Sequence, residues 1–464
     1  MNSNNTLKAI ESVVSPGGVL LGKDVSARPD SWPPVGGCQA MAIIRPVNTG
    51  EVSQVLKICY EAGQNVVTHG GLTGLVGGAR ATKEDIVLSL ERMNKLDAVD
   101  TINRTVTVEA GVPLQKVHET AAGADLLFPL DLGARGSCTI GGNIATNAGG
   151  NSVIRYGMMR EQLLGVEAVL ADGTIVSSLN GVLKNNTGYD LKQLFVGSEG
   201  TLGIVTRAVL RLRPAPRSTN TAMVGIENFE QVGAFLRDMD SALGGTLSAF
   251  EVLWNDFYQT IVDDSGRHTP PLDSSHKFYV LIESTGGHQE SDRLRFEAAL
   301  EEAFASELIV DAVIAQSKQQ REDLWAIRDD IENLTQKLSP PILFDVSLGI
   351  PKMDSYVEEI RAQLKARWPA SKMVSFGHLG DGNIHLVITV GSHEPSEVQA
   401  VESIVYEALG RCQGIVSAEH GIGLDKREHL RHSRSEVEIS LMRSLKQALD
   451  PKGILNRGKI FEQA

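Results

Sequence analysis

The sequence has few cysteines, no block of basic residues and no long apolar run, and each absence excludes a class of protein. Its four cysteines lie far apart and form no C-x-x-C pair, which argues against a disulfide framework and a cysteine-based zinc site. The formal net charge is −13 at pH 7, so nucleic acid is not an expected partner. No apolar run reaches ~18 residues, and we therefore expect no transmembrane segment.

Signals for export and for bound redox metals are missing as well. The N-terminus has no basic start followed by an apolar stretch, so we predict no signal peptide and a cytoplasmic location. The chain contains neither a haem-binding C-x-x-C-H motif nor a cysteine cluster for an iron–sulfur centre.

Glycine is plentiful, with 46 residues among 464, and much of it lies in three clusters. The central cluster, residues 135–150, reads RGSCTIGGNIATNAGG. Because it lacks bulky side chains, this run lets backbone N–H groups approach a large flat ligand closely. Ile140, Ile144 and Ala148 recur at helical spacing, so one face still packs, which is not typical of a flexible linker.

A second cluster, residues 69–78 (HGGLTGLVGG), directly follows a predicted strand at residues 65–68. A strand at 40–44 and a helix from Asn48 to Gly63 precede it, which indicates a βαβ-like unit. Successive N–H groups in such a loop can surround a phosphate. The loop does not match a P-loop and is a poor Rossmann fingerprint, so an ordinary turn stays open as the alternative.

The third cluster, residues 197–204 (GSEGTLGI), precedes a predicted strand at 205–212. Beyond it, predicted strands alternate with amphipathic helices, which indicates an α+β domain with an antiparallel sheet. We predict four parts: an N-terminal arm at 1–35 that contains Pro29, Pro33 and Pro34, a first domain at 36–216, a second at 217–420 and a C-terminal segment at 421–464.

Two histidines, His378 and His385, flank the turn sequence Gly-Asp-Gly-Asn. A turn there, between predicted strands at 373–376 and 384–390, brings both imidazoles to one end of a hairpin, where they can hold a divalent metal. Two unrelated histidines beside a turn are the alternative. A short strand at 415–418 is predicted to deliver Glu419 and His420 into a glycine turn. Two histidines and one carboxylate leave metal positions open for a substrate, and His420 is a candidate general base.

The order of three long segments carries a family resemblance: HGGLTGLVGG, GSCTIGGNIATNAGG and NTGYDLKQLFVGSEGTLGIVT. It resembles the FAD-binding domain of the vanillyl-alcohol oxidase type, the PCMH fold, and within it the FAD-dependent D-2-hydroxyacid dehydrogenases. That family comprises D-lactate and D-2-hydroxyglutarate dehydrogenases and the glycolate-oxidase catalytic subunit. Over about residues 46–459 the resemblance implies an α+β protein. Its PCMH-type domain has two α+β subdomains, its cap domain an antiparallel sheet, and its C-terminal helical segment returns to the flavin domain.

The resemblance also implies non-covalent FAD, with Gly70–Gly74 around the pyrophosphate and His69 as a non-linking residue. The full set of residues that it implies at FAD is His69, Gly70, Gly71, Leu72, Thr73, Gly74, Leu75, Pro129, Gly136, Ser137, Thr139, Ile140, Gly141, Gly142, Asn143, Thr146, Asn147, Gly149, Gly150, Gly200, Ile204 and Asn456.

The chemistry that the resemblance implies is a metal-assisted oxidation. Zn²⁺ or Mn²⁺ on His378, His385 and Glu419 chelates the 2-hydroxy acid and lowers the pKa of its hydroxyl. His420 takes the hydroxyl proton, and the C2 hydride passes to flavin N5. Arg328 binds a substrate carboxylate through its planar fork, although from the sequence alone a solvated helix face is an equal alternative.

Partners and oligomeric state follow from the same reasoning. Since no haem or iron–sulfur motif is present, electrons must leave to a separate carrier: an electron-transfer flavoprotein, a quinone or a cytochrome. A homodimer is the family-level expectation.

The substrate side chain is predicted from three positions where the 2-hydroxyglutarate branch offers polar groups and this chain has Glu332, Leu343 and Val387. A distal carboxylate would be poorly paired there, which is costly. We therefore expect a D-lactate-like acid with a short or apolar side chain, lined by Leu343 and Val387 and contacted by Arg328 and His420. Alternatives are a D-2-hydroxyglutarate dehydrogenase, an oxidase that uses O₂, a sugar oxidase of the same fold, and a non-catalytic flavin-binding subunit of a glycolate-oxidase-like complex. The metal motif argues against the last two.

Overall fold

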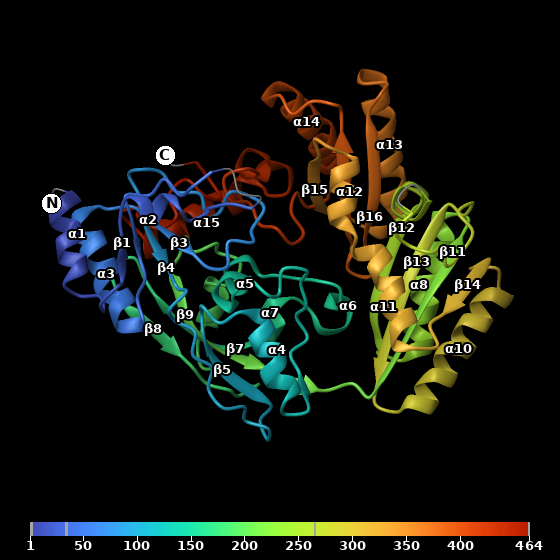
Figure 1. Ribbon diagram of the computed structural model, residues 1–464, viewed down its shortest axis with the longest axis horizontal. Helices are drawn as coiled ribbons and strands as arrows, with labels where there is room; N and C mark the ends of the chain where they lie inside the picture. The colour runs from blue at the N-terminus through green and yellow to red at the C-terminus, as the bar shows by residue number, and fades with distance from the viewer. Residues whose placement is uncertain (1–2, 33–35, 264–265, 463–464) are drawn as a thin grey trace. The chain divides into compact units, whose positions relative to one another are not determined.

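The computed structural model describes residues 3–32, 36–263 and 266–462, and the chain divides into two compact units of helices and strands (Figure 1). Unit 1 comprises Met1–Gly150, Gly157–Ala215 and Glu419–Ala464; unit 2 comprises Asn151–Tyr156 and Pro216–Ala418. Both units contain helices and sheets, so the predicted α+β class is confirmed. Pro33 and Pro34 of the predicted arm lie outside the described residues.

The first sheet of unit 1 has the order β1-β2-β4-β3 and contains the βαβ unit. Its strands are β1 (Val19–Leu20), β2 (Ala42–Ile44), β3 (Val66–His69) and β4 (Ile86–Ser89). Strands β2 and β3 both pair with β4 in parallel because helix α3 (Thr49–Ala62) carries the chain across between them. The Asn48 side chain caps α3 and Gly63 ends it at φ 66°. Strand β3 opens directly into the glycine loop.

The second sheet of unit 1 is antiparallel, with the order β5-β9-β7-β8. Its strands are β5 (Thr105–Glu109), β7 (Leu163–Val169), β8 (Ile175–Ser178) and β9 (Ile204–Arg211). Ile140 and Ile144 of helix α5 (Ile140–Thr146) join the core packed on this sheet. Residues 96–100 form only isolated bridges, Leu96 to Val108 and Asp100 to Thr105, and Asp100 closes a turn by accepting the N–H groups of Ile102 and Asn103.

The C-terminal segment of unit 1 lies beside β3. Val66 donates its N–H to Ile454 O, and Asn456 donates its N–H to Val66 O. The Asn456 side chain accepts the Thr68 N–H at 3.0 Å. This pairing brings Asn456 to the start of the glycine loop. The other elements of unit 1 are α1 (Ser3–Glu11), α2 (Lys23–Ser26), α4 (Leu114–Ala122), β6 (Leu126–Leu127), α7 (Met159–Gln162), η1 (Leu191–Leu194), β10 (Arg213–Pro214), η5 (Arg427–His432) and α15 (Glu436–Leu449).

Unit 2 is built on a seven-stranded antiparallel sheet of order β14-β11-β13-β12-β16-β17-β15. Its strands are β11 (Ser218–Ile226), β12 (Leu247–Trp254), β13 (Phe278–Gly286), β14 (Asp311–Ile314), β15 (Ile342–Ser347), β16 (Lys372–His378) and β17 (Asn383–Thr389). Its helices are α6 (Val153–Tyr156), α8 (Phe229–Leu243), α9 (Asn255–Tyr258), η2 (Gln259–Asp263), α10 (Gln289–Ala305), α11 (Lys318–Asp329), α12 (Ile331–Lys337), η3 (Ile350–Lys352), α13 (Met353–Arg367), η4 (Leu379–Asp381) and α14 (Pro395–Arg411).

The two faces of this sheet are covered by different helices. Phe235 of α8 contacts Phe250 of β12, with ring centroids 5.6 Å apart. Since neighbouring residues of a strand point to opposite faces, Glu251 points away from α8. On that opposite face, Ile327 of α11 and Leu334 of α12 pack in one cluster with Phe376. Helices α11 and α12 therefore cover the face that carries the site.

Segment 415–418 forms only one bridge, between Ile415 and Ser347, so the predicted short strand is wrong. The reason is local: β15 ends at Ser347, and the ladder offers no partner beyond it. Among the residues that the structure describes, no helix is long and apolar enough to cross a membrane.

Candidate active site

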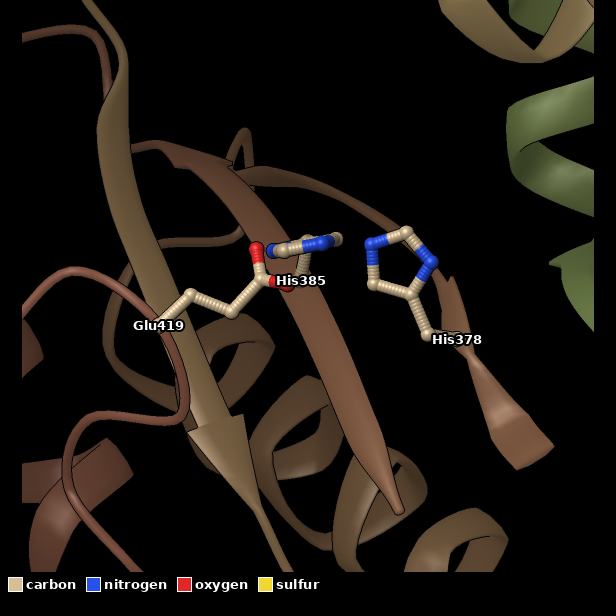
Figure 2. A group of neighbouring side chains, drawn as sticks. All are labelled: His378, His385 and Glu419. Atoms are coloured by element: carbon tan, nitrogen blue, oxygen red, sulfur yellow. The ribbon is translucent and has the colours of Figure 1, made fainter. Parts of the chain in front are cut away.

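Three side chains form a possible metal site. His378 ends β16, His385 lies on β17, and the intervening turn closes at Gly382 with φ 84°. The candidate ligand atoms of His378, His385 and Glu419 all lie within 4.8 Å of one another, and Figure 2 shows these side chains pointing toward one another. Glu419 follows Ala418, the last residue of unit 2. A pair of imidazoles and one carboxylate is a donor set typical of a catalytic divalent metal.

A buried carboxylate that the sequence analysis missed stands behind His378. Glu251 is fully buried and is the cross-strand partner of His378. Its Oε1 lies 2.7 Å from His378 Nδ1, and its Oε2 accepts the Arg328 Nε–H at 2.8 Å. Burial raises the pKa of Glu251, but the charges of His378 and Arg328 outweigh this and lower it to about 2.

Arg328 lies at this site and not on a solvated face. Its side chain comes from α11 and the residue is only 6% exposed. The guanidinium stacks over the Phe376 ring at 5.2 Å, and Nη2 lies 3.2 Å from His378 Nε2. The structure therefore excludes the solvated alternative and brings Arg328 beside a candidate metal ligand.

The surroundings of His385 are set by the register of β17. Its cross-strand partners are Phe376 and Asp345, so all three share one face. Asp345 is fully buried, accepts from Asn383 Nδ2 at 2.6 Å, and has Oδ1 3.8 Å from His385 Nδ1. The sequence analysis missed Asp345, although it lies in the same segment as Leu343.

Leu343 and Val387 are cross-strand partners two register positions from Asp345 and His385, and therefore lie on the same face of the sheet. Val387 is buried in the cluster beneath α11 and α12, whereas Leu343 is 44% exposed. Glu332 is exposed on α12. Leu343 and Val387 therefore form an apolar row beside His385 on the face of the sheet that carries the metal group.

Unit 1 contains a cavity of about 370 Å³ lined by all three glycine clusters and by Glu419 and His420. The predicted FAD residues in its lining are His69, Gly70, Gly71, Leu72, Thr73, Gly74, Leu75, Thr139, Gly141, Gly142, Asn143, Thr146, Gly149, Gly200, Ile204 and Asn456. The predicted residues outside its lining are Pro129, Gly136, Ser137, Ile140, Asn147 and Gly150.

Two of the residues outside the lining, Ile140 and Asn147, stabilise the fold around helix α5. Ile140 is fully buried in the core, and Asn147 ends α5 in a left-handed conformation with φ 50°. The Asn147 side chain accepts the Arg160 N–H at 2.9 Å. Residues of the lining that the sequence analysis missed include Thr68, Cys138, Phe195, Ser198 and Glu199. Cys138, Ser198 and Glu199 lie within the glycine clusters, and Thr68 and Phe195 lie within two residues of one, so position in or beside a cluster is the signal that could have found them.

The cavity wall presents hydrogen-bond donors without protein partners. The backbone N–H groups of residues 71–74 donate to no other group among the described residues. Leu72 has φ 58°, which turns successive N–H groups of this loop toward one side. The buried Thr68 Oγ1, Thr139 Oγ1 and Asn143 Nδ2 also lack a partner within that part of the chain. Such a wall fits a ligand rich in phosphate and carbonyl oxygens, as FAD is.

Glu199 connects the third glycine cluster to the segment after His420. Its carboxylate accepts the N–H groups of Ile422 at 2.7 Å and Gly423 at 2.8 Å. Gly421 has φ 84°, a conformation that favours glycine, and a Cβ there would lie 2.8 Å from Glu199 Oε1. Burial raises the pKa of Glu199, against these hydrogen bonds and the charges of Lys459 and Lys426. The backbone that carries His420 is thereby anchored to the cavity wall.

His69 is a neutral structural residue of the cavity wall. Its Nε2 lies 2.8 Å from Ala79 O and must donate a hydrogen bond there. Burial lowers the pKa of His69 to about 4, although the bond to Ala79 acts in the opposite direction.

Two protein families match the chain. The family described as FAD linked oxidases, C-terminal domain, matches residues 215–460, and the FAD binding domain matches residues 40–178. A relative named mitochondrial D-2-hydroxyglutarate dehydrogenase, from Rattus norvegicus, is 38% identical over 98% of this chain and 84% of its own length. A mitochondrial putative D-lactate dehydrogenase from Schizosaccharomyces pombe is 40% identical over 89% of this chain and 80% of its own length.

The fold also matches a solved structure. The chain aligns with p-cresol methylhydroxylase with a TM-score of 0.78, covering 98% of this chain and 96% of that one at 16% identity. At this identity the likeness shows the fold alone, and it confirms the predicted PCMH-type architecture. The expectation of a cytoplasmic location is contradicted, because several relatives are named as mitochondrial. Residues that build a flavin and metal site carry no signal of the compartment.

The buried His69 predicts how stability depends on pH. Its pKa is 6.5 in a model peptide and about 4 in the folded chain, so the unfolded chain binds the extra proton between these values. The free energy of unfolding should therefore fall from pH 6.5 toward pH 4, by about 3 kcal/mol from this residue. Urea unfolding of the wild type and of His69→Gln at pH 7.5 and 4.5 measures it. The variant should lose less stability on acidification; an equal loss would contradict the prediction.

Proposed function

Because the chain belongs to the family of FAD-linked oxidases that includes the D-2-hydroxyglutarate and D-lactate dehydrogenases, we propose that it oxidises a D-2-hydroxy acid to the 2-oxo acid through a metal-assisted step. The observation that carries this proposal is the pair Glu419 and His420. Glu419 belongs to the metal group, and both residues line the FAD cavity. One dipeptide thus links a candidate metal to the flavin.

FAD would be held by Thr68, Thr139 and Asn143 and by the N–H groups of residues 71–74, which have no partner in the part of the chain that the structure describes. When bound, it supplies the acceptor for the hydride from C2 of the substrate. We propose non-covalent binding, since the Nε2–H of His69 is committed to Ala79 O and its ring is buried.

A divalent metal, Zn²⁺ or Mn²⁺, would be held by His378, His385 and Glu419. When bound, it supplies a Lewis acid that lowers the pKa of the substrate hydroxyl. The donor set fits this task because three protein ligands leave positions open.

The chain itself supplies a base and an anion-binding group. His420 follows Glu419 directly and lines the cavity, which suits it to take the hydroxyl proton. Arg328, stacked on Phe376 beside His378, would bind the substrate carboxylate through its Nη groups.

For the substrate side chain we propose a short or apolar group, because Leu343 and Val387 form an apolar row beside His385. D-2-Hydroxyglutarate is the second candidate, favoured by the names of several relatives. The intact metal set argues against a non-catalytic subunit. We also propose a separate electron carrier, since the sequence lacks haem and iron–sulfur motifs. The homodimer stays a prediction.

Anaerobic reduction of the flavin by a panel of acids tests the substrate proposal. We expect D-lactate and D-2-hydroxybutyrate to bleach the oxidised flavin band faster than D-2-hydroxyglutarate does, and the L-acids not to bleach it. The apolar row gives a distal carboxylate no partner. Faster bleaching by D-2-hydroxyglutarate would contradict the apolar proposal and leave the dehydrogenase assignment intact. A yellow protein that no hydroxy acid bleaches would contradict both.

Replacing the proposed base gives a second test. His420→Asn should keep bound FAD, since the other lining residues are unchanged, but lose about 10²–10⁴-fold in the rate of flavin reduction. Stopped-flow absorbance measures that rate, and the flavin-to-protein ratio is the control. A near-normal rate in a protein that keeps FAD would remove the assignment of His420 as base.

A further inference from the structure

We propose that Glu251 is a positioning residue that fixes a metal ligand and the substrate-binding arginine with one carboxylate. The inference deepens the proposed function and rests on its assignments of His378 and Arg328. All three residues belong to unit 2.

Glu251 is an exception within its strand. Strand β12 reads LSAFEVLW and is buried along its whole length. A fully buried carboxylate is costly unless its charge and its hydrogen bonds are satisfied. The sheet register places His378 directly opposite, and α11 places Arg328 above the same face. Glu251 therefore lies at the one place in this apolar strand where both His378 and Arg328 reach its carboxylate.

The two oxygens of Glu251 have separate partners. Oε1 is 2.7 Å from His378 Nδ1, so Nδ1 carries the hydrogen and donates it. This places the lone pair of His378 on Nε2, the nitrogen that Arg328 Nη2 contacts and that would bind a metal. Oε2 accepts the Arg328 Nε–H at 2.8 Å, so the carboxylate holds the guanidinium at its Nε.

One carboxylate thus sets the spacing between the metal-binding nitrogen and the guanidinium. Arg328 Nη2 lies 3.2 Å from His378 Nε2. A 2-hydroxy acid carries its hydroxyl and its carboxylate on adjacent carbons, so a metal and a guanidinium held this close can address both groups. The corresponding carboxylate distance at His385 is longer, since Asp345 Oδ1 lies 3.8 Å from His385 Nδ1 and accepts from Asn383.

Glu251→Gln tests the proposal in the full-length, FAD-loaded protein. An amide offers one acceptor where two donors must be met, so either His378 or Arg328 loses its fixed geometry. We expect Zn²⁺ affinity, measured by competition with a chromophoric chelator, to fall about 10–100-fold. The KM for the hydroxy acid should rise, and the flavin-to-protein ratio should stay unchanged. With Co²⁺ bound in place of Zn²⁺, the visible absorption spectrum of Glu251→Gln should differ from that of the wild type.

Asp256→Asn is the matched control. Asp256 is another carboxylate of unit 2 that pairs with an arginine, Arg361 at 2.5 Å, and it also accepts the Ser375 N–H. We expect this variant to be less stable than the wild type but to keep the Zn²⁺ affinity and the KM. An equal loss of Zn²⁺ affinity in both variants would assign the effect to general destabilisation and overturn the proposal.

The remaining outcomes separate this inference from the proposed function. A wild type that binds Zn²⁺ tightly, with Glu251→Gln unchanged in affinity, Co²⁺ spectrum and KM, would overturn the positioning role alone. A wild type that binds neither Zn²⁺ nor Mn²⁺ would overturn the metal-assisted function, and the role of Glu251 toward His378 with it.

Discussion

The antiparallel register of β12, β16, β17 and β15 is the constraint on which the proposed chemistry depends. Residues opposite one another in such a ladder share a face, so one register places Glu251 against His378 and both Phe376 and Asp345 against His385. A slip of one residue would turn every one of these side chains to the other face. The apolar cluster on the site face and the contact between Phe235 and Phe250 on the other face stabilise this register, and the polar groups of the site therefore depend on hydrophobic packing.

In unit 1 the constraint is different: backbone N–H donors must reach a large cofactor while the cavity stays open. The glycine loop after β3 leaves the N–H groups of residues 71–74 without partners among the described residues. Glu199 then anchors the segment after His420 to the same wall. The cofactor cavity and the proposed base, His420, are thus parts of one packed structure.

Much of this could be predicted from the sequence wherever the signal is local. The glycine clusters, the N-cap at Asn48 and the hairpin between His378 and His385 each depend on residues within a short window, and the structure has them. The expected strand at 415–418 was wrong because β15 ends at Ser347, which leaves only the single bridge between Ile415 and Ser347.

Side chains whose partners lie far along the chain could not be found in the same way. Glu251 lies 127 residues from His378, and Glu199 lies 223 residues from Ile422. In the sequence, a glutamate within an apolar strand or a glycine loop carries no mark of such a partner. The register of the sheet and the packing of the C-terminal segment create these contacts, and both are properties of the folded chain.

The most direct test of the central claim, that a metal on His378, His385 and Glu419 acts together with FAD, is single-turnover flavin reduction before and after metal removal. FAD-loaded protein is treated with a chelator, checked for retained flavin, and mixed anaerobically with D-lactate in a stopped-flow instrument. The account predicts that reduction is lost after chelation and restored by Zn²⁺ or Mn²⁺. A reduction rate that is unchanged in metal-free protein would contradict it.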